Sequence, residues 1–188
     1  MSYKPILIVA GEPNSIFLEI FFKSISKNYF KSPIIIIVSQ KLLIAQMKIL
    51  GFNFKLNVIN ENYFHLKQLN NKKINIINVD YNFRKPFEKI SIKSNGYITK
   101  CFDLALRMIN ENKNFNLING PISKKHFLKG KSLGITEYLA KKTKNNNNVA
   151  MLIYNEKLSV SPITTHLALK DVHKNISKQK IYNHVKLI

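Results

Sequence analysis

Residue types that bind anions or metals are concentrated in three parts of the sequence. The first, Gly11-Glu12-Pro13-Asn14-Ser15, is a glycine turn leading into a helix, and backbone N–H groups at a helix start can hold an anion. The last, Thr164-Thr165-His166, places an imidazole after two hydroxyl groups. His166 is therefore a candidate metal ligand or acid–base group. Each segment also has a simpler interpretation. The glycine segment can be an ordinary turn, and His166 can be an ordinary hydrogen-bonded histidine.

The middle part pairs Asn119-Gly120-Pro121-Ile122-Ser123-Lys124 with Gly134-Ile135-Thr136-Glu137. Lys124 can present a cation and Thr136 a hydroxyl to a phosphate or carboxylate. Each residue taken alone has an ordinary role, Lys124 as a surface lysine and Thr136 as the N-cap of a helix. The sequence contains neither a dinucleotide fingerprint nor a Walker-type phosphate loop.

The remaining histidines give little support to a zinc site. The spacing of His166 and His173 matches no standard zinc pattern. The other three histidines of the chain are interpreted as surface residues: His65, His126 and His184.

Alternating apolar runs and helical patterns predict the elements that position these segments. Strands are predicted at residues 6–10, 34–38, 54–59, 74–79 and 115–118, with helices at 14–27, 39–50, 96–110, 122–128 and 136–142. Strands alternating with helices predict an α/β fold, a mostly parallel sheet flanked by helices, with antiparallel pairing late in the chain. Such sheets bind ligands at the carboxyl ends of their strands.

The end of the sequence predicts a hairpin and a long helix. Residues 151–154 and 158–163 form the predicted hairpin around Asn155-Glu156, and residues 171–188 form the helix. Its apolar face, formed by Ile181, Val185 and Ile188, has little predicted to cover it, which indicates that a downstream partner segment is missing. The alternative is that the helix packs on the existing core and frays.

Composition limits the functional classes. The chain has 188 residues, 45% hydrophobic residues and a net charge of +20. Its lysines are scattered over nearly every predicted element, so we expect solvated surface and neither a nucleic-acid nor a membrane partner, although a basic binding protein remains an alternative. The single cysteine, Cys101, predicts a buried structural thiol and a reducing, cytoplasmic location. No apolar run approaches the ~20 residues of a membrane span.

Together the segments resemble the 4-hydroxythreonine-4-phosphate dehydrogenase family. The run from Thr164 to Val172, Thr-Thr-His-Leu-Ala-Leu-Lys-Asp-Val, resembles the family motif T-T-H-L-P-L-R-D, and Gly134-Ile135-Thr136-Glu137 resembles G-H-T-E. Gly11-Glu12-Pro13 and Asn119–Lys124 resemble its opening and glycine-proline-lysine motifs. The resemblance implies a two-domain isocitrate/isopropylmalate-dehydrogenase-like architecture, of which residues 1–188 form the N-terminal portion without the C-terminal one.

The chemistry implied by the resemblance is oxidation, with decarboxylation, of 4-phosphooxy-L-threonine in pyridoxal phosphate biosynthesis. It uses NAD and a divalent metal (Zn, Mg or Co) in a cytoplasmic homodimer. His166 matches the first of three metal-binding histidines and Thr136 a substrate-binding threonine, while Lys124 lies in the lysine-containing motif. Ile135 stands in place of a substrate-binding histidine.

The sequence also departs from the family pattern. Phe17 and Leu18 stand where a second glycine and a proline are usual. The other two metal histidines and the residues lining the cofactor pocket belong to the absent portion. We therefore expect this chain alone not to hold metal and NAD usefully and to be inactive. It could be half of a split enzyme that needs a complementing chain, or a non-catalytic or regulatory relative.

Overall fold

The computed structural model describes residues 3–61, 63, 69, 71–112, 114–130, 132–145 and 148–188. His65 lies outside them. The chain divides into two compact units, unit 1 (Met1–Phe127) and unit 2 (Leu128–Ile188).

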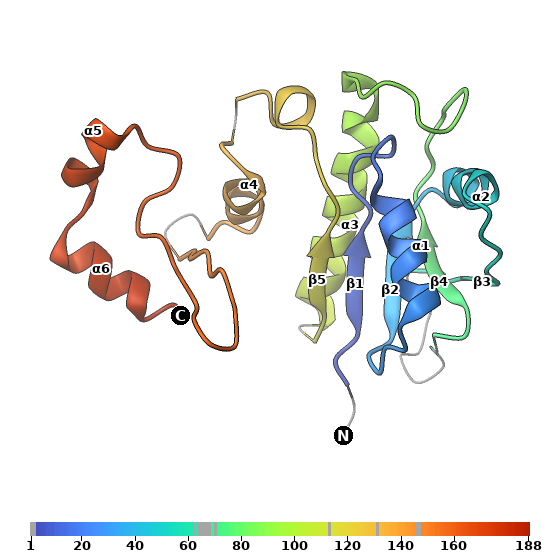
Figure 1. Cartoon of the computed structure of the whole chain (residues 1–188), viewed down its shortest axis with the longest axis horizontal. Coiled ribbons are helices and arrows are strands. Elements are labelled where there is room, and N and C mark those ends of the chain that lie inside the picture. The colour runs from blue at the N-terminus through green and yellow to red at the C-terminus, as the bar shows by residue number, and fades with distance from the viewer. Residues whose placement is uncertain are drawn as a thin grey trace. The chain divides into compact units, whose positions relative to one another are not determined.

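Unit 1 contains a five-stranded parallel sheet, shown in Figure 1. Its strands are β1 (Ile6–Val9), β2 (Ile34–Val38), β3 (Leu56–Val58), β4 (Ile74–Asn78) and β5 (Asn116–Asn119). They lie in the order β3-β4-β2-β1-β5, and every neighbouring pair is parallel. The α/β class and all five strands predicted from the sequence are therefore confirmed.

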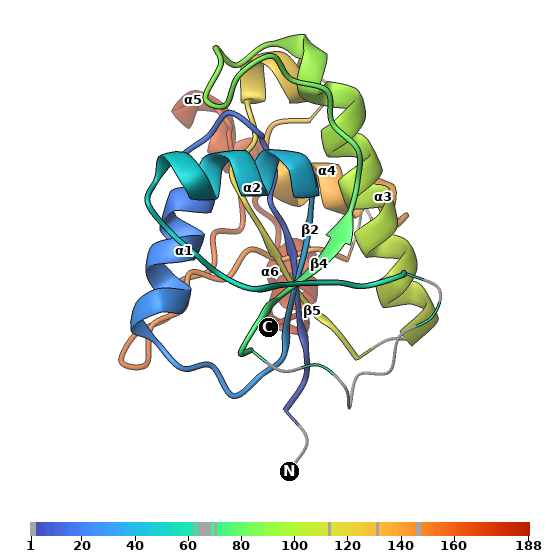
Figure 2. The same ribbon diagram turned by 90° about the vertical axis from the view of Figure 1, so that its right-hand side faces the viewer.

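Helices cover both faces of this sheet, as Figure 2 shows. On one face lie α1 (Phe17–Lys27) and α2 (Gln40–Ile49), whose Phe22 and Leu43 pack with Ile36 in the main core cluster. On the other lies α3 (Asn95–Asn112), which contacts β1 and β2. Burial on both faces explains why the central strands are almost continuous runs of Ile and Val.

The helix ends of unit 1 largely follow the sequence signals. Ser39 caps α2 by accepting a hydrogen bond from the Leu42 N–H (3.4 Å), and Gly51 after the helix has φ +73°. A short helix, η2 (Ile92–Ser94), precedes α3. In α3, Cys101 is 0% exposed and burial raises its pKa to about 12, which confirms the predicted buried thiol.

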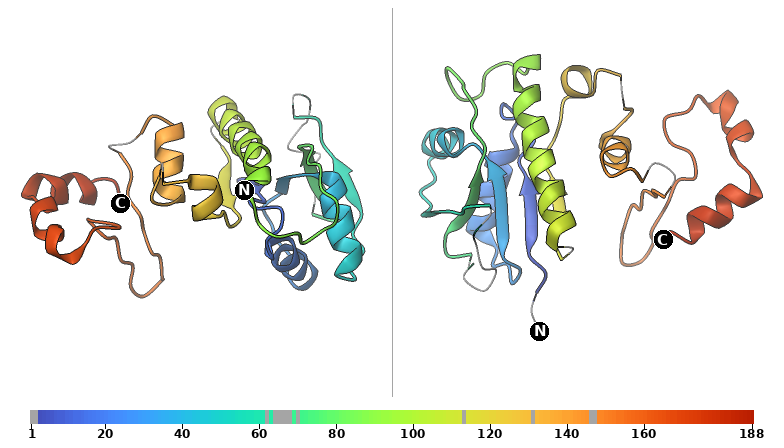
Figure 3. Two further views of the ribbon diagram at one scale, coloured as in Figure 1. Left: turned by 90° about the horizontal axis from the view of Figure 1, so that it is seen from above. Right: turned by 180° about the vertical axis from the view of Figure 1, so that it is seen from behind.

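Unit 2 has short elements joined by irregular segments, visible on the right of the second view in Figure 3. After η3 (Lys124–Leu128), which straddles the boundary, come α4 (Ile135–Lys142), α5 (Leu169–Val172), η4 (His173–Asn175) and α6 (Lys178–Val185). The predicted hairpin strands are wrong, because the pairing is a single antiparallel bridge between Ile153 and Val160. The predicted turn is held by Ser159, which donates to the Asn155 carbonyl at 3.1 Å.

The predicted single helix over residues 171–188 is also wrong. The backbone is extended at Ile176, and a new helix starts after Ser177, whose hydroxyl accepts from the Lys180 N–H at 3.2 Å. A serine cap with its own first turn therefore divides the pattern into two helices. The apolar residues named for this segment are nevertheless open to solvent: Ile181, Val185 and Ile188 are 42%, 65% and 59% exposed.

Over the part of the chain that the structure describes, no helix combines the length and apolar character needed to cross a bilayer.

Candidate functional site

Two glycine turns meet at the carboxyl ends of β1 and β5. The Glu12 N–H donates to the Pro121 carbonyl at 2.8 Å, and the Gly120 N–H donates to the Val9 carbonyl at 2.7 Å. A Cβ on Gly120 would lie 2.1 Å from the Ala10 oxygen. Gly11 has φ +76°, and a Cβ there would lie 2.4 Å from the Pro121 oxygen. Both glycines are required because two backbones approach too closely for any side chain.

Glu12 is the buried ionisable group of this turn, with only 3% of its surface exposed. Its carboxylate accepts from the Ser94 hydroxyl (2.9 Å) and the Asn14 N–H (3.3 Å). Burial raises the pKa of this carboxyl above its ordinary 4.5, although these two hydrogen bonds and the charge of His126 act in the opposite direction. The cost of burying the charge is therefore the dominant effect.

The anion-binding role predicted for this turn is not supported. The N–H of Glu12 donates to Pro121, that of Asn14 to the Glu12 side chain, and that of Ser15 to the Glu12 carbonyl. Internal bonds occupy these three backbone donors, so they are not available to an anion. The turn instead fixes the close contact between β1 and the Asn119-Gly120-Pro121 segment.

Lys124 begins η3, directly after this second glycine turn, and its side chain is exposed. The helix is attached to the sheet layer through Asn95 of α3, which donates to the His126 carbonyl at 2.8 Å. The Ser123 hydroxyl accepts from the His126 N–H at 3.2 Å and so caps the first turn. The position suits a lysine that meets an anion from solvent, and Lys124 stays a predicted substrate-binding residue of unit 1.

In unit 2, His166 lies beside the start of α4. A Cβ built on Gly134 would lie 3.7 Å from His166 Nε2 and 3.0 Å from Glu137 Oε2. The other oxygen of Glu137 accepts from the Thr165 hydroxyl at 3.4 Å. Glu137 thus links the start of α4 to the Thr-Thr-His segment, and Gly134, which has no side chain, leaves room for both the imidazole and the carboxylate.

Thr136 is the second residue of α4 and not its N-cap, so that prediction is wrong. The cap is Gly134, which makes no side-chain bond, and Glu137 stands at the third helical position. Glu137 does not bond back to the helix start, because Oε1 accepts from the Thr165 hydroxyl and Oε2 has no hydrogen-bond partner. Thr136 is left half-buried with its substrate role untested.

His166 does not follow a strand, as the sequence had indicated, but lies in an irregular segment with an exposed side chain. Its φ is +57°, which is uncommon outside glycine and tolerated better by histidine than by branched residues. Strained backbone of this kind is concentrated at functional sites. An exposed imidazole on a strained backbone is therefore more consistent with a ligand-binding role than with a histidine packed in the core.

Two residues near this segment were missed by sequence reasoning. Glu137 Oε2 is buried without a hydrogen-bond partner, and its sequence signal was its place at the end of the Gly134–Glu137 motif, to which no role was assigned. His184, expected on the surface, is half-buried with Nε2 2.6 Å from the Ser161 hydroxyl. Both border a cavity of about 700 Å³ within unit 2, also lined by Thr136 and Thr165.

The family model described as pyridoxal phosphate biosynthetic protein PdxA matches residues 30–188. The chain belongs to this family. Two curated relatives, both 4-hydroxythreonine-4-phosphate dehydrogenases, come from a Sulfurihydrogenibium species and from Aquifex aeolicus. The first is 30% identical over 96% of this chain and 55% of its own length. The second is 30% identical over 98% of this chain and 57% of its own length. The chain thus spans a little over half the length of the PdxA relatives it matches.

Solved structures show the same fold. The 4-hydroxythreonine-4-phosphate dehydrogenase of Klebsiella pneumoniae has a TM-score of 0.80 and 22% identity, and the match covers 97% of this chain and 56% of that protein. The Burkholderia phymatum enzyme has a TM-score of 0.79 and 21% identity, with 98% and 57% covered. The expected α/β architecture of the PdxA family is therefore confirmed.

The residues of this PdxA member do not fit a complete metal centre. Within the described ranges, no group of three His, Cys, Asp or Glu side chains is placed to hold a metal ion. A catalytic metal normally takes three protein ligands. His166 can supply one, so the described residues provide at most part of such a site.

Proposed function

We propose that this chain forms the N-terminal portion of a dehydrogenase that oxidises 4-phosphooxy-L-threonine in pyridoxal phosphate biosynthesis. The observation that carries the proposal is the His166 segment, which Glu137 links to the start of α4 beside Thr136. The names of the relatives support the reaction. Because the chain spans little more than half of those proteins, substrate, cofactor and partner are all part of the proposal.

The proposed roles divide between binding and coordination. Lys124 and Thr136 each bind the phosphorylated substrate through a charge-assisted hydrogen bond, Lys124 as an ammonium donor and Thr136 as a hydroxyl donor to an ionised oxygen. The net charge of +20 raises the local concentration of this anion. His166 contributes one ligand to a divalent metal. The other ligands and the contacts to NAD would come from the portion of the relatives' length that this chain does not span.

The test is NADH formation from 4-phosphooxy-L-threonine, NAD and a divalent metal. We expect none with this chain alone, and turnover once a polypeptide matching the remaining part of a relative is added. His166→Ala should abolish the complemented activity, whereas the matched control His173→Ala should retain it. Thr136→Val should raise KM about tenfold, the cost of one hydrogen bond to a charged group.

Two results would contradict the proposal. One is an inactive mixture under conditions in which a full-length relative turns over and the two polypeptides bind each other. The other is equal loss of activity in His166→Ala and His173→Ala, which would remove any special role for the imidazole after the paired threonines.

A non-catalytic relative is the second candidate, and Ile135 is the residue that favours it. By resemblance this position holds a substrate-binding histidine, and an isoleucine side chain can neither donate nor accept a hydrogen bond. If the missing hydrogen bond limits activity, Ile135→His should increase NADH formation by the complemented protein at low substrate concentration. No change in the Ile135→His variant, with wild-type protein also inactive, would favour the non-catalytic role.

A further inference from the structure

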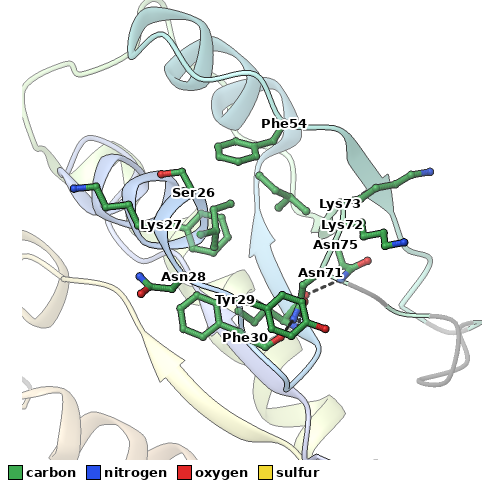
Figure 4. A pocket seen from close by; sticks show the side chains of 14 residues that line it. Ser26, Lys27, Asn28, Tyr29, Phe30, Phe54, Asn71, Lys72, Lys73 and Asn75 are labelled. Atoms are coloured by element: carbon green, nitrogen blue, oxygen red, sulfur yellow. Dashed lines mark hydrogen bonds between the residues drawn. The ribbon is translucent and has the colours of Figure 1, made fainter.

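A separate cavity lies in unit 1 at the amino ends of β2 and β4, shown in Figure 4. Its volume is about 360 Å³, and it is bordered by the end of α1, the α1–β2 connection and the segment entering β4. The glycine turns of Gly11 and Gly120 stand at the opposite, carboxyl ends of the strands. The cavity therefore belongs to neither the proposed dehydrogenase site nor its glycine turns.

The cavity has an apolar and aromatic lining. Its hydrophobic side chains come from every bordering element: Phe21, Ile25, Tyr29, Phe30, Ile34, Phe54 and Ile74. Tyr29 is 88% exposed at the mouth. An aromatic ring so little covered offers a free face for stacking on a planar ligand.

Three lysines line the cavity with these rings, and no acidic side chain does so among the lining residues the structure describes. Lys27 lies on one side of the mouth and Lys72 and Lys73 on the other (Figure 4). Lysine carries its charge on a flexible stem of four carbons, so the ammonium groups of Lys27 and Lys73 can swing over a bound anion. A charge of one sign around an apolar hollow favours a ligand of the opposite sign.

The cavity wall is built before any ligand arrives. Asn71 donates to the carbonyls of Phe30 (2.8 Å) and Ser32 (2.7 Å) and accepts from the Ile34 N–H (3.0 Å). Asn75 donates to the Ile34 carbonyl at 2.9 Å. These bonds attach the α1–β2 connection to the entry of β4, so the ordering entropy of the wall is not lost again on binding.

We propose that this cavity binds a small aromatic anion, with its ring against Tyr29 and the apolar floor and its phosphate, sulfonate or carboxylate facing the lysines. A volume of about 360 Å³ is near the lower end of small-molecule pockets, which span roughly 300–1,000 Å³. A neutral apolar ligand would gain nothing from the charges of Lys27 and Lys73, and a simple inorganic anion would leave the aromatic floor uncovered. Both features are satisfied together only by an amphipathic molecule.

The test compares two dyes that differ in charge. Anilinonaphthalene sulfonate is an aromatic anion, and phenylnaphthylamine is its neutral counterpart. The chain has no tryptophan, so Tyr29→Trp places a single reporter at the mouth of the cavity. We expect saturable quenching of this tryptophan by energy transfer to the anionic dye, and about tenfold weaker binding of the neutral one.

Two sets of variants in the full chain locate the site. Lys27→Gln combined with Lys73→Gln should reduce the preference for the anionic dye about tenfold, whereas Lys41→Gln with Lys48→Gln on α2 should leave it unchanged. Ser26→Phe places a ring beside the mouth and should weaken both dyes. Thermal unfolding checks that each variant is folded.

Equal effects of the two lysine pairs would overturn the proposal, since they would reduce it to general attraction by a basic surface. Unchanged dye binding in folded Ser26→Phe, or no tryptophan quenching at saturating dye, would overturn it as well. None of these readouts depends on dehydrogenase activity.

Discussion

Unit 1 and unit 2 differ in how they hold their candidate site residues. In unit 1 the glycine turns follow β1 and β5 of a sheet whose central residues, such as Ile35 and Ile36, are 0% exposed. In unit 2, among the residues described, the buried hydrophobic side chains are Leu128 and Ala140. The turns of unit 1 are therefore fixed by a buried core, whereas the His166 segment depends on a few polar contacts.

This difference concerns local stability. Segments with few buried apolar contacts open with a smaller free energy than core strands and helices. We therefore infer that unit 2 opens more readily than unit 1. A ligand or polypeptide that binds the ordered form would stabilise it by mass action.

The largest expected effect is the loss of core packing in unit 1. Phe22 is 0% exposed, so Phe22→Ala should lower the free energy of unfolding of unit 1 by about 3–5 kcal/mol. The matched change in unit 2, Ile181→Ala at a side chain 42% exposed, should cost under about 0.5 kcal/mol. The single buried thiol, Cys101, provides the measurement, because it reacts with a thiol reagent only when unit 1 opens.

Labelling of Cys101 in increasing urea would give the free energy of opening of unit 1 in Phe22→Ala and the wild type, and hydrogen exchange of the α6 backbone amides would give that of unit 2 in Ile181→Ala and the wild type. Equal destabilisation by the two substitutions would break the comparison, since it would show that the face of α6 is packed as tightly as the core. A fast reaction of Cys101 in the native wild type would also break the comparison, because it would show that unit 1 opens readily.

A smaller effect is expected at Gly120. Gly120→Ala places a Cβ 2.1 Å from the Ala10 oxygen, and backbone cannot move aside as a side chain can. The β1–β5 contact must open, at a cost of about 2–4 kcal/mol. Gly96→Ala in α3, where nothing lies within 4 Å, should instead stabilise by up to about 1 kcal/mol. Urea unfolding followed by circular dichroism would measure both changes, and similar values would contradict the close approach.

The sheet of unit 1 could be predicted because its signals are local and agree with one another. Ile34–Val38 is a strand by composition and length, and Ser39 and Gly51 mark the limits of the following helix. Unit 2 gave weaker signals. Residues 151–163 alternate as strands do, yet only Ile153 and Val160 pair, because β-structure depends on neighbours that periodicity does not reveal.

The candidate site was predicted by residue type but not by geometry. Resemblance selected His166, Thr136 and Lys124, whereas nothing in the sequence linked Glu137 to Thr165. The same holds for the contact between Gly11 and Pro121, since the two residues are far apart in the chain. Side-chain pairing across such separations is set by the fold and not by local pattern.

A pH-dependent effect is expected from Glu12. Its pKa is raised by burial above 4.5, so the folded state holds the proton more tightly than the unfolded state. The contribution of Glu12 to stability is therefore greatest at pH values below its ordinary pKa of 4.5. It falls as the pH rises from there through the raised pKa, and it is constant at higher pH. Each pKa unit corresponds to about 1.4 kcal/mol.

Glu12→Gln should remove this part of the pH dependence while keeping a side-chain acceptor for Ser94. Urea unfolding of variant and wild type from below pH 4.5 to neutral pH would measure the difference between their free energies of unfolding. As the pH rises, the Gln variant should become more stable relative to the wild type. A difference that stays constant, or moves in favour of Glu, would show that the hydrogen bonds from Ser94 and Asn14 outweigh burial of the charge.

A small effect on stability, and the one most specific to the candidate site of unit 2, is expected for Gly134→Ala. The Cβ would meet only the ends of two side chains, Glu137 Oε2 at 3.0 Å and His166 Nε2 at 3.7 Å. Both can rotate away, and the φ of −155° is open to alanine, so the cost in unfolding free energy should stay below about 1 kcal/mol. Displacement of the imidazole is the informative result. In NMR spectra the His166 ring protons should shift while those of His173 remain in place. If Gly134→Ala instead cost as much as Gly120→Ala, unit 2 would be as rigid around this glycine as the sheet is around the other, and the contrast between the two units would fail.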